Sequence, residues 1–161
     1  MERILSVSNK PQSWFKGDQH ITDEAGKELY AASWRHGFPT AIWTLRRDGK
    51  EVATLRRKAL APLRTCNVTM GSHEFVLRNV LSLSRRTVVE GGPFDTAVLS
   101  GDLIGLNFRL VLRDQLLAEA ESKLLSMCDR YAVRLLSSEP EAELLTALMM
   151  MNLMVEKYEE A

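Results

Sequence analysis

The strongest hydrophobic pattern in the chain lies near its C-terminus. From Ala142 to Val155 the sequence reads AELLTALMMMNLMV, in which eleven of fourteen residues are apolar. At about 100° per residue these side chains point in every direction around a helix axis, and a helix without a polar face must be surrounded by protein. We therefore expect a buried central helix at about 140–157. Ser137-Ser138-Glu139-Pro140 predicts its start.

Before this run, residues 13 to 136 show the short alternating segments that are typical of strands. The clearest is a hairpin from Ile42 to Leu55, whose Asp48-Gly49 pair suits a two-residue type I′ turn because both positions need positive φ. This turn predicts that Arg46 pairs with Glu51. The same register pairs Leu45 with Val52 and Trp43 with Thr54.

Further strand signals recur at even spacing and predict a closed barrel. The expected hairpins are Arg64–Thr69 with His73–Asn79, and Asn107–Arg113 with Leu116–Lys123 around Asp114-Gln115; further strands are expected at 19–22, 28–34, 83–89, 95–100 and 130–136. Closure removes exposed sheet edges, and a barrel of more than about eight strands has room inside for a helix. We therefore predict one domain, residues 1–161, with the helix in the lumen.

Composition and charge narrow the function classes. Lys plus Arg and Asp plus Glu both number 21, so the net charge is zero, which disfavours nucleic acid as a partner. The apolar run is shorter than the roughly 20 residues that a membrane-spanning helix needs, so we expect no transmembrane segment. The N-terminus lacks a secretory pattern, which predicts a cytoplasmic protein, and Cys66 and Cys128 are interpreted as free buried thiols.

Several short motifs occur in a defined order along almost the whole chain, from about Trp14 to Val155. They are Phe15, Ile21–Gly26 and Tyr30; Thr44–Val52; Gly101-Asp102 before Phe108; and Asp129–Val133 before the apolar helix. In this ordered set the chain resembles the LURP-one-related family, which is related to the tubby C-terminal domain and to the phospholipid scramblases.

The resemblance implies a mainly β, tubby C-terminal-like fold, an antiparallel barrel of about twelve strands closed around the hydrophobic C-terminal helix. Tubby-like domains bind phosphoinositide head groups, and scramblases are associated with lipid movement and calcium. The membrane segment and the cysteine-rich palmitoylation stretch of scramblases are absent from this sequence. No motif here allows the phosphoinositide site of tubby to be transferred residue by residue.

The most suggestive polar feature is a set of basic residues that could bind an anion or a lipid head group, because guanidinium groups match phosphate oxygens in two-point hydrogen bonds. The candidates are Arg46, Arg47, Arg56, Arg57, Lys58 and Arg64, with Arg85 and Arg86 as a second pair. The alternative is that these residues form the solvent face of strands and pair with acids such as Glu51. The zero net charge favours this alternative.

Signals for catalysis, metals and cofactors are weak. His20, His36 and His73 lack the spacing of metal ligands, and neither a nucleophile elbow nor a phosphate-binding glycine loop occurs. We therefore expect a non-catalytic binding or scaffold module that takes acidic phospholipid, such as a phosphoinositide, or a protein partner at the membrane periphery. The alternatives are a membrane-active, scramblase-related protein and a carrier with a small-ligand cavity at a barrel mouth.

Overall fold

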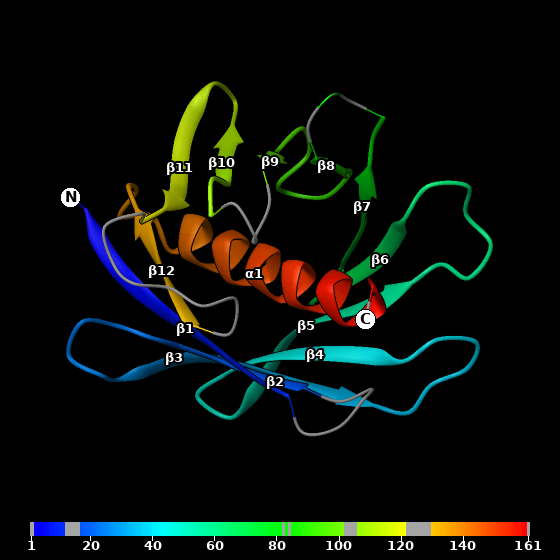
Figure 1. Ribbon diagram of the computed structural model, residues 1–161, viewed down its shortest axis with the longest axis horizontal. Helices are drawn as coiled ribbons and strands as arrows, with labels where there is room; N and C mark the ends of the chain where they lie inside the picture. The colour runs from blue at the N-terminus through cyan, green and yellow to red at the C-terminus, as the bar shows by residue number, and fades with distance from the viewer. Residues whose placement is uncertain are drawn as a thin grey trace.

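The computed structural model describes residues 2–11, 17–81, 83, 85–101, 106–121 and 130–160. It is a closed antiparallel barrel of twelve strands around one C-terminal helix, which confirms the predicted fold class (Figure 1). Phe15, Asp102, Cys128 and Asp129 lie outside the described residues.

The strands follow one another around the barrel in chain order, and β12 returns to pair with β1. Their bounds are β1 Arg3–Pro11, β2 Gly17–Thr22, β3 Glu28–Arg35, β4 Ile42–Arg47, β5 Lys50–Arg57, β6 Thr65–Met70, β7 His73–Asn79, β8 Arg86–Glu90, β9 Val98–Ser100, β10 Arg109–Leu112, β11 Gln115–Ala120 and β12 Arg130–Leu135. In such an up-and-down order, every second loop lies at the same end of the barrel.

The strand that sequence reasoning missed, β1, is the one that closes the barrel. It pairs with β2 from Ser6 to Pro11 and with β12 from Arg3 to Ser8. The sequence pattern is typical of a strand, because the apolar Leu5 and Val7 alternate with Ser6, and both apolar side chains are buried in the barrel. Closure through β1 leaves neither β2 nor β12 with an unpaired edge.

The β4–β5 hairpin confirms the predicted turn and corrects its register. Asp48 and Gly49 have φ of 52° and 76°, as a type I′ turn requires. Arg46 pairs with Glu51 as expected, but a bulge then leaves Val52 unmatched. The next pairs are therefore Leu45 with Ala53 and Trp43 with Leu55, one residue away from the prediction.

The β10–β11 hairpin has its turn one residue earlier than predicted. Arg113 and Asp114, with φ of 49° and 64°, form the turn in place of Asp114-Gln115. Asp tolerates positive φ, and the Arg residue before it adopts the same conformation without glycine. The strands themselves are shorter than expected, at Arg109–Leu112 and Gln115–Ala120.

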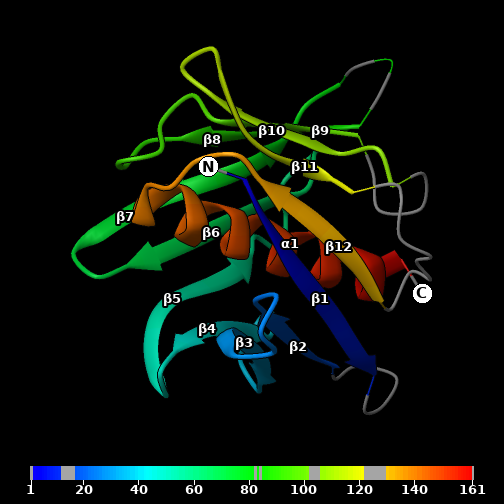
Figure 2. The same cartoon turned by 90° about the vertical axis from the view of Figure 1, so that its left-hand side faces the viewer.

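The helix α1 (Pro140–Glu160) runs through the barrel, with strands on all sides of it (Figures 1 and 2). From Leu145 to Val155 each side chain is buried, including all four methionines. Thioethers adapt to an irregular barrel wall, which explains why methionine is concentrated here. Pro140 at the first helical position and acids in the first turn match the predicted start.

Within the described residues no helix combines the length and the apolar character needed to cross a membrane. The helix is instead fixed by specific polar contacts inside the lumen. Gln19 Nε2 donates to Asn9 Oδ1 and to the carbonyl of Met150, both at 2.9 Å. Tyr131 is buried and donates its hydroxyl hydrogen to Met150 Sδ at 3.5 Å.

Candidate functional site

The ends of the strands place charged side chains at both mouths of the barrel. Along β5 the buried Ala53 and Leu55 face the lumen, so Arg57, two residues further on, continues the same face to the rim. By the same alternation Arg64 comes two residues before the inward-facing Cys66, and Arg85 comes two residues before the inward-facing Thr87, so both arginines also continue the inner face to the rim. We call the end of the barrel where α1 finishes the C-terminal mouth, lined by Arg57, Arg64, Arg85, Glu156 and Glu159.

The C-terminal mouth holds an ion-pair network that ties the last turns of α1 to the barrel. Arg85 Nε donates to Glu156 Oε1 at 2.7 Å, and Arg85 Nη2 bonds the other oxygen of the same carboxylate. Arg64 Nε donates to Glu159 Oε2 at 2.8 Å, and Arg57 donates to that oxygen at 3.2 Å. Guanidinium–carboxylate pairs of this kind fix both the position and the rotation of the helix.

Asn152 joins the same network. Its Oδ1 accepts a hydrogen bond of 2.8 Å from Arg64 Nη1, so the partner of this buried amide is a side chain. Among the described residues, three buried nitrogens of the network lack a partner: Arg64 Nη2, Arg85 Nη1 and Asn152 Nδ2. All three are donors, and three guanidinium groups face two carboxylates, so the network has an excess of positive charge.

The network also shifts the pKa values of groups in and beside it. Burial alone would raise the pKa of Glu156, but the hydrogen bonds and charge of Arg85, with the charge of Arg64, hold that pKa below its ordinary value. Burial raises the pKa of the neighbouring Cys66 thiol to about 11, against a smaller opposing effect of Arg64. Cys66 is therefore an inert buried thiol, as the sequence predicted for it.

A smaller cluster holds the first turns of α1 at the opposite mouth. Arg3 forms an ion pair with Glu143, and Arg47 Nη2 lies 3.9 Å from the same carboxylate. The Arg47 guanidinium also lies over the Tyr30 ring, 5.6 Å from its centroid. Burial, and then the charge of Glu143, raise the pKa of Tyr30 to about 12. Charged groups thus anchor the helix at both ends, while the lumen between them is mainly apolar.

The structure separates the six basic residues that the sequence singled out. Arg47 lies at the opposite mouth. Arg46, the residue before it in β4, donates to Ser33 Oγ at 2.7 Å. Arg57, Lys58 and Arg64 gather at or beside the C-terminal mouth. Arg56, on the outer face of β5, donates to the carbonyl of Phe38.

A surface cavity of about 760 Å³ lies under the β5–β6 loop. It is lined by Lys58, Ala59, Leu60, Ala61, Pro62, Leu63, Thr65 and Arg78. Lys58 N donates to the carbonyl of Thr65 at 2.8 Å, and Asn79 N donates to that of Arg64 at 2.9 Å, so backbone bonds hold both ends of the loop. The two charged side chains of this lining are cations, and no Asp or Glu is among its described residues.

A second cavity, of about 560 Å³, lies on the outer face of β4 to β7 and has a different charge pattern. Arg35 and Arg56 line it, but so does Glu74, with polar Thr and Asn side chains. The mixed charge makes it a poorer anion site than the loop cavity. Among the described residues, no group of three His, Cys, Asp or Glu side chains could hold a metal ion.

Sequence reasoning missed four large hydrophobic side chains that stand in solvent: Phe38, Leu60, Leu81 and Leu83. Each is at least 86% exposed. They lie in the loops that join β3 to β4, β5 to β6 and β7 to β8. These are alternate loops of the meander, so all three are at the end of the barrel where α1 finishes.

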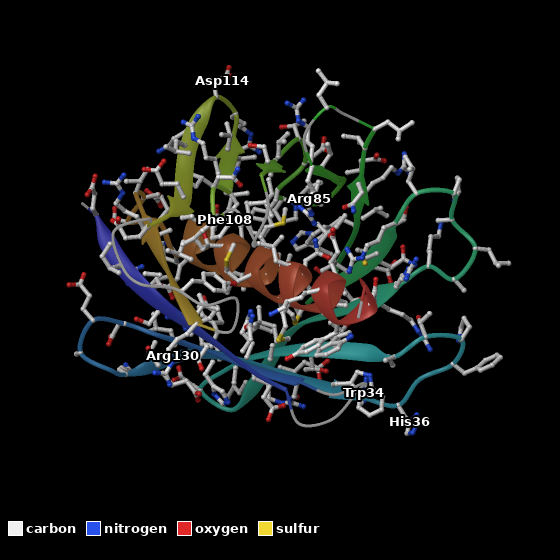
Figure 3. All side chains as sticks on the ribbon, in the orientation of Figure 1. Trp34, His36, Arg85, Phe108, Asp114 and Arg130 are labelled. Carbon is white, nitrogen blue, oxygen red and sulfur yellow. The ribbon has the colours of Figure 1, made fainter. Side chains whose placement is uncertain are left out.

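The strand pairings confirm this placement. Ile42 pairs with Arg56 and Arg57 pairs with Cys66, which puts the β3–β4 and β5–β6 loops at one end. Asn79 pairs with Thr87 beside the same rim. In Figure 1 the β3–β4 and β5–β6 loops extend on the side where the chain ends, and Figure 3 shows Trp34 and His36 leading into the first of them.

Comparison with solved structures finds the same architecture in a plant protein. The X-ray structure of the protein AT5G01750 from Arabidopsis thaliana aligns with a TM-score of 0.61 at 13% sequence identity. The alignment covers 92% of this chain and 90% of that chain. The two proteins share a fold. No family model and no curated protein sequence matches this chain.

Proposed function

We propose that this barrel is a non-catalytic binding module of the LURP-one-related type that recognises the anionic head group of a phospholipid. One observation carries the proposal: the loop cavity presents Lys58 and Arg78 without an opposing acid in its lining. Its volume lies within the range of small-molecule sites, and its wall is otherwise aliphatic. This chemistry suits a phosphate group that is attached to hydrocarbon.

The existing partner of Arg78 does not prevent such binding. Arg78 Nη1 lies 3.0 Å from Glu90 Oε1, and both side chains are close to half exposed. Surface ion pairs of this kind contribute about 1 kcal/mol or less, so a phosphate can replace the carboxylate at small cost. Lys58 adds a second charge, and the excess positive charge of the C-terminal mouth nearby strengthens the local field.

Alternatives from the sequence have less support. In a scramblase-like activity α1 would leave the barrel and insert into a bilayer, which would break the ion pairs of Glu143 and Glu156 and expose their partners. The cytoplasmic face of a membrane, where anionic lipids are concentrated, is the location that this function requires.

A soluble short-chain lipid tests the proposal without a bilayer. We expect dihexanoyl phosphatidic acid or the dihexanoyl 4,5-bisphosphorylated phosphoinositide, titrated by calorimetry or NMR, to bind at one site. The double variant Lys58→Gln with Arg78→Gln should weaken binding at least tenfold. Lys27→Gln with Lys50→Gln, which removes two exposed cations from turns at the opposite end, is the matched control.

Two results would contradict the proposal. One is no binding of either short-chain lipid at millimolar concentration. The other is equal weakening by the cavity variant and the control variant, since that would assign binding to net charge alone. Binding of a protein partner with unchanged affinity in the cavity variant would favour the protein-binding alternative.

A further inference from the structure

The four exposed hydrophobic side chains share one end of the barrel with an unusual charge distribution. The three loops that carry them span residues 36–41, 58–64 and 80–85, and we call them the mouth loops. Their sequences, HGFPTA, KALAPLR and VLSLSR, contain no Asp or Glu. Their charged residues are the cations Lys58, Arg64 and Arg85.

The turns at the other end differ in charge, because they contain more acids than cations. They span 23–27, 48–49, 71–72, 91–97 and 113–114, and their sequences contain five acids. These acids are Asp23, Glu24, Asp48, Asp95 and Asp114. None of the four large exposed hydrophobics lies in these turns, and Figure 3 shows Asp114 at the tip of the β10–β11 hairpin. These turns are therefore polar with more acids than cations, whereas the three mouth loops are apolar and carry cations without acids.

We propose that the mouth loops form a membrane-docking surface, on which Phe38, Leu60, Leu81 and Leu83 insert into an anionic bilayer while α1 stays inside the barrel. This deepens the proposed function and rests on it, because docking brings the loop cavity to the head groups. Charge complementarity identifies the partner as an anionic lipid surface, since the apolar tips lie among cations in loops without acids, whereas the turns at the far end carry more acids than cations.

The geometry of the tips favours a bilayer over a folded protein partner. The exposed side chains are distributed over three separate loops around a basic mouth, each nearly fully exposed. Burying a Leu or Phe side chain in hydrocarbon is favourable. The attraction between basic residues and an anionic surface adds to this gain, and the two together favour reversible docking.

Vesicle flotation with the full chain tests the surface. We expect binding to phosphatidylcholine vesicles that contain 30% phosphatidylserine. The triple variant Phe38→Ser, Leu81→Ser and Leu83→Ser leaves the cavity lining intact and should reduce this binding at least tenfold. It should leave the affinity for soluble dihexanoyl phosphatidic acid unchanged. The matched variant Phe38→Leu, Leu81→Met and Leu83→Met should retain vesicle binding, because the tips stay apolar.

A fluorescent label reports which end meets the bilayer. Cys66 is buried and unreactive, and the substitution Cys128→Ser removes the other native cysteine. In this background, the single variants Leu81→Cys and Asp114→Cys each carry the environment-sensitive label NBD at the introduced cysteine. We expect a blue shift on vesicle binding for the label at position 81 and no shift for the label at position 114.

The outcomes separate this inference from the proposed function. If the serine triple variant binds vesicles as tightly as the parent, or if only the label at position 114 shifts, end-on docking is wrong. If the parent binds the soluble lipid but no vesicle, docking is wrong and head-group recognition stands. Binding to neither overturns both.

Discussion

At the scale of single residues, the chemistry of this protein concentrates where side chains face inward at the ends of strands. Alternation along β5 to β8 gives a buried apolar lumen and, one step beyond it, the cations of the C-terminal mouth. Glu156 is the centre of that network, because two guanidinium groups converge on its carboxylate. Its removal would take from Arg85 the carboxylate that it pairs with, and would leave Arg64 with Glu159.

Replacing Glu156→Gln should lower the free energy of unfolding by about 3 kcal/mol, since breaking a buried ion pair costs more than the pair contributes. Urea unfolding at pH 7 measures this. Glu90→Gln, which removes the acid of an exposed pair, is the control and should change it by about 1 kcal/mol or less. Equal effects of the two variants would show that the mouth network is no stronger than a surface pair.

The depressed pKa of Glu156 also predicts a pH dependence. Because the pKa is lower in the folded than in the unfolded chain, where it is close to 4.5, this stabilisation is full above that value. It is lost as the pH falls through the folded pKa. Stability measured from pH 6 downwards should therefore fall more steeply in the parent protein than in Glu156→Gln. Parallel curves would contradict the assignment.

At the scale of elements, α1 is the core of the barrel. Its side chains from Leu145 to Val155 contact inward-facing residues of strands all around the lumen, and two charged clusters hold its ends. The helix therefore supplies the hydrophobic surface that every strand needs on its inner face. A barrel of this circumference cannot fill its own lumen with strand side chains.

Deleting residues 140–161 should leave an insoluble or molten chain, because the lumen loses its contents. The measurements are near-UV circular dichroism and the binding of a hydrophobic dye. A deletion of residues 160 and 161, which keeps Glu159 and its ion pairs, is the control and should unfold cooperatively like the parent. A soluble, cooperatively unfolding chain without α1 would show that the helix is an appendage.

At the scale of the whole molecule, the barrel is polarised along the axis of α1. The mouth loops, at the end where α1 finishes, combine apolar tips with cations, and the turns at the opposite end carry more acids than cations. Net charge is zero for the whole chain, so this separation cannot be seen in composition. The six basic residues that looked like one patch in the sequence divide between the two ends and the outer wall.

Salt dependence should distinguish the two forces that act in membrane docking. At about 1 M salt the screening length is only about 3 Å, so attraction between the mouth and anionic lipid is lost while apolar insertion persists. Flotation of the parent should decline with added salt but remain detectable. At this salt concentration the serine triple variant should lose all binding to vesicles. Complete loss in the parent at high salt would mean that the loop tips do not insert.

The sequence alone determined much of this protein because its dominant signals are local. An apolar run without a polar face requires enclosure, Asp48-Gly49 fixes a turn, and alternation marks the strands. Local signals gave the wrong position for features that depend on the neighbouring strand. The bulge at Val52 and the turn at Arg113-Asp114 are two such features, because both reflect the twist and pairing of strands. The role of β1 comes from closing the barrel, where it pairs with both β2 and β12.

Only the tertiary structure decided which distant residues meet. Arg64 and Arg85 reach Glu156 from strand ends some 70 to 90 positions away in the chain, and closure of the barrel around α1 brings them there. Likewise Phe38, Leu60 and Leu81 are unremarkable in sequence, because isolated apolar loop residues are common. Their position at one basic end follows from the alternation of loops in a closed meander, a property of topology that no local pattern contains.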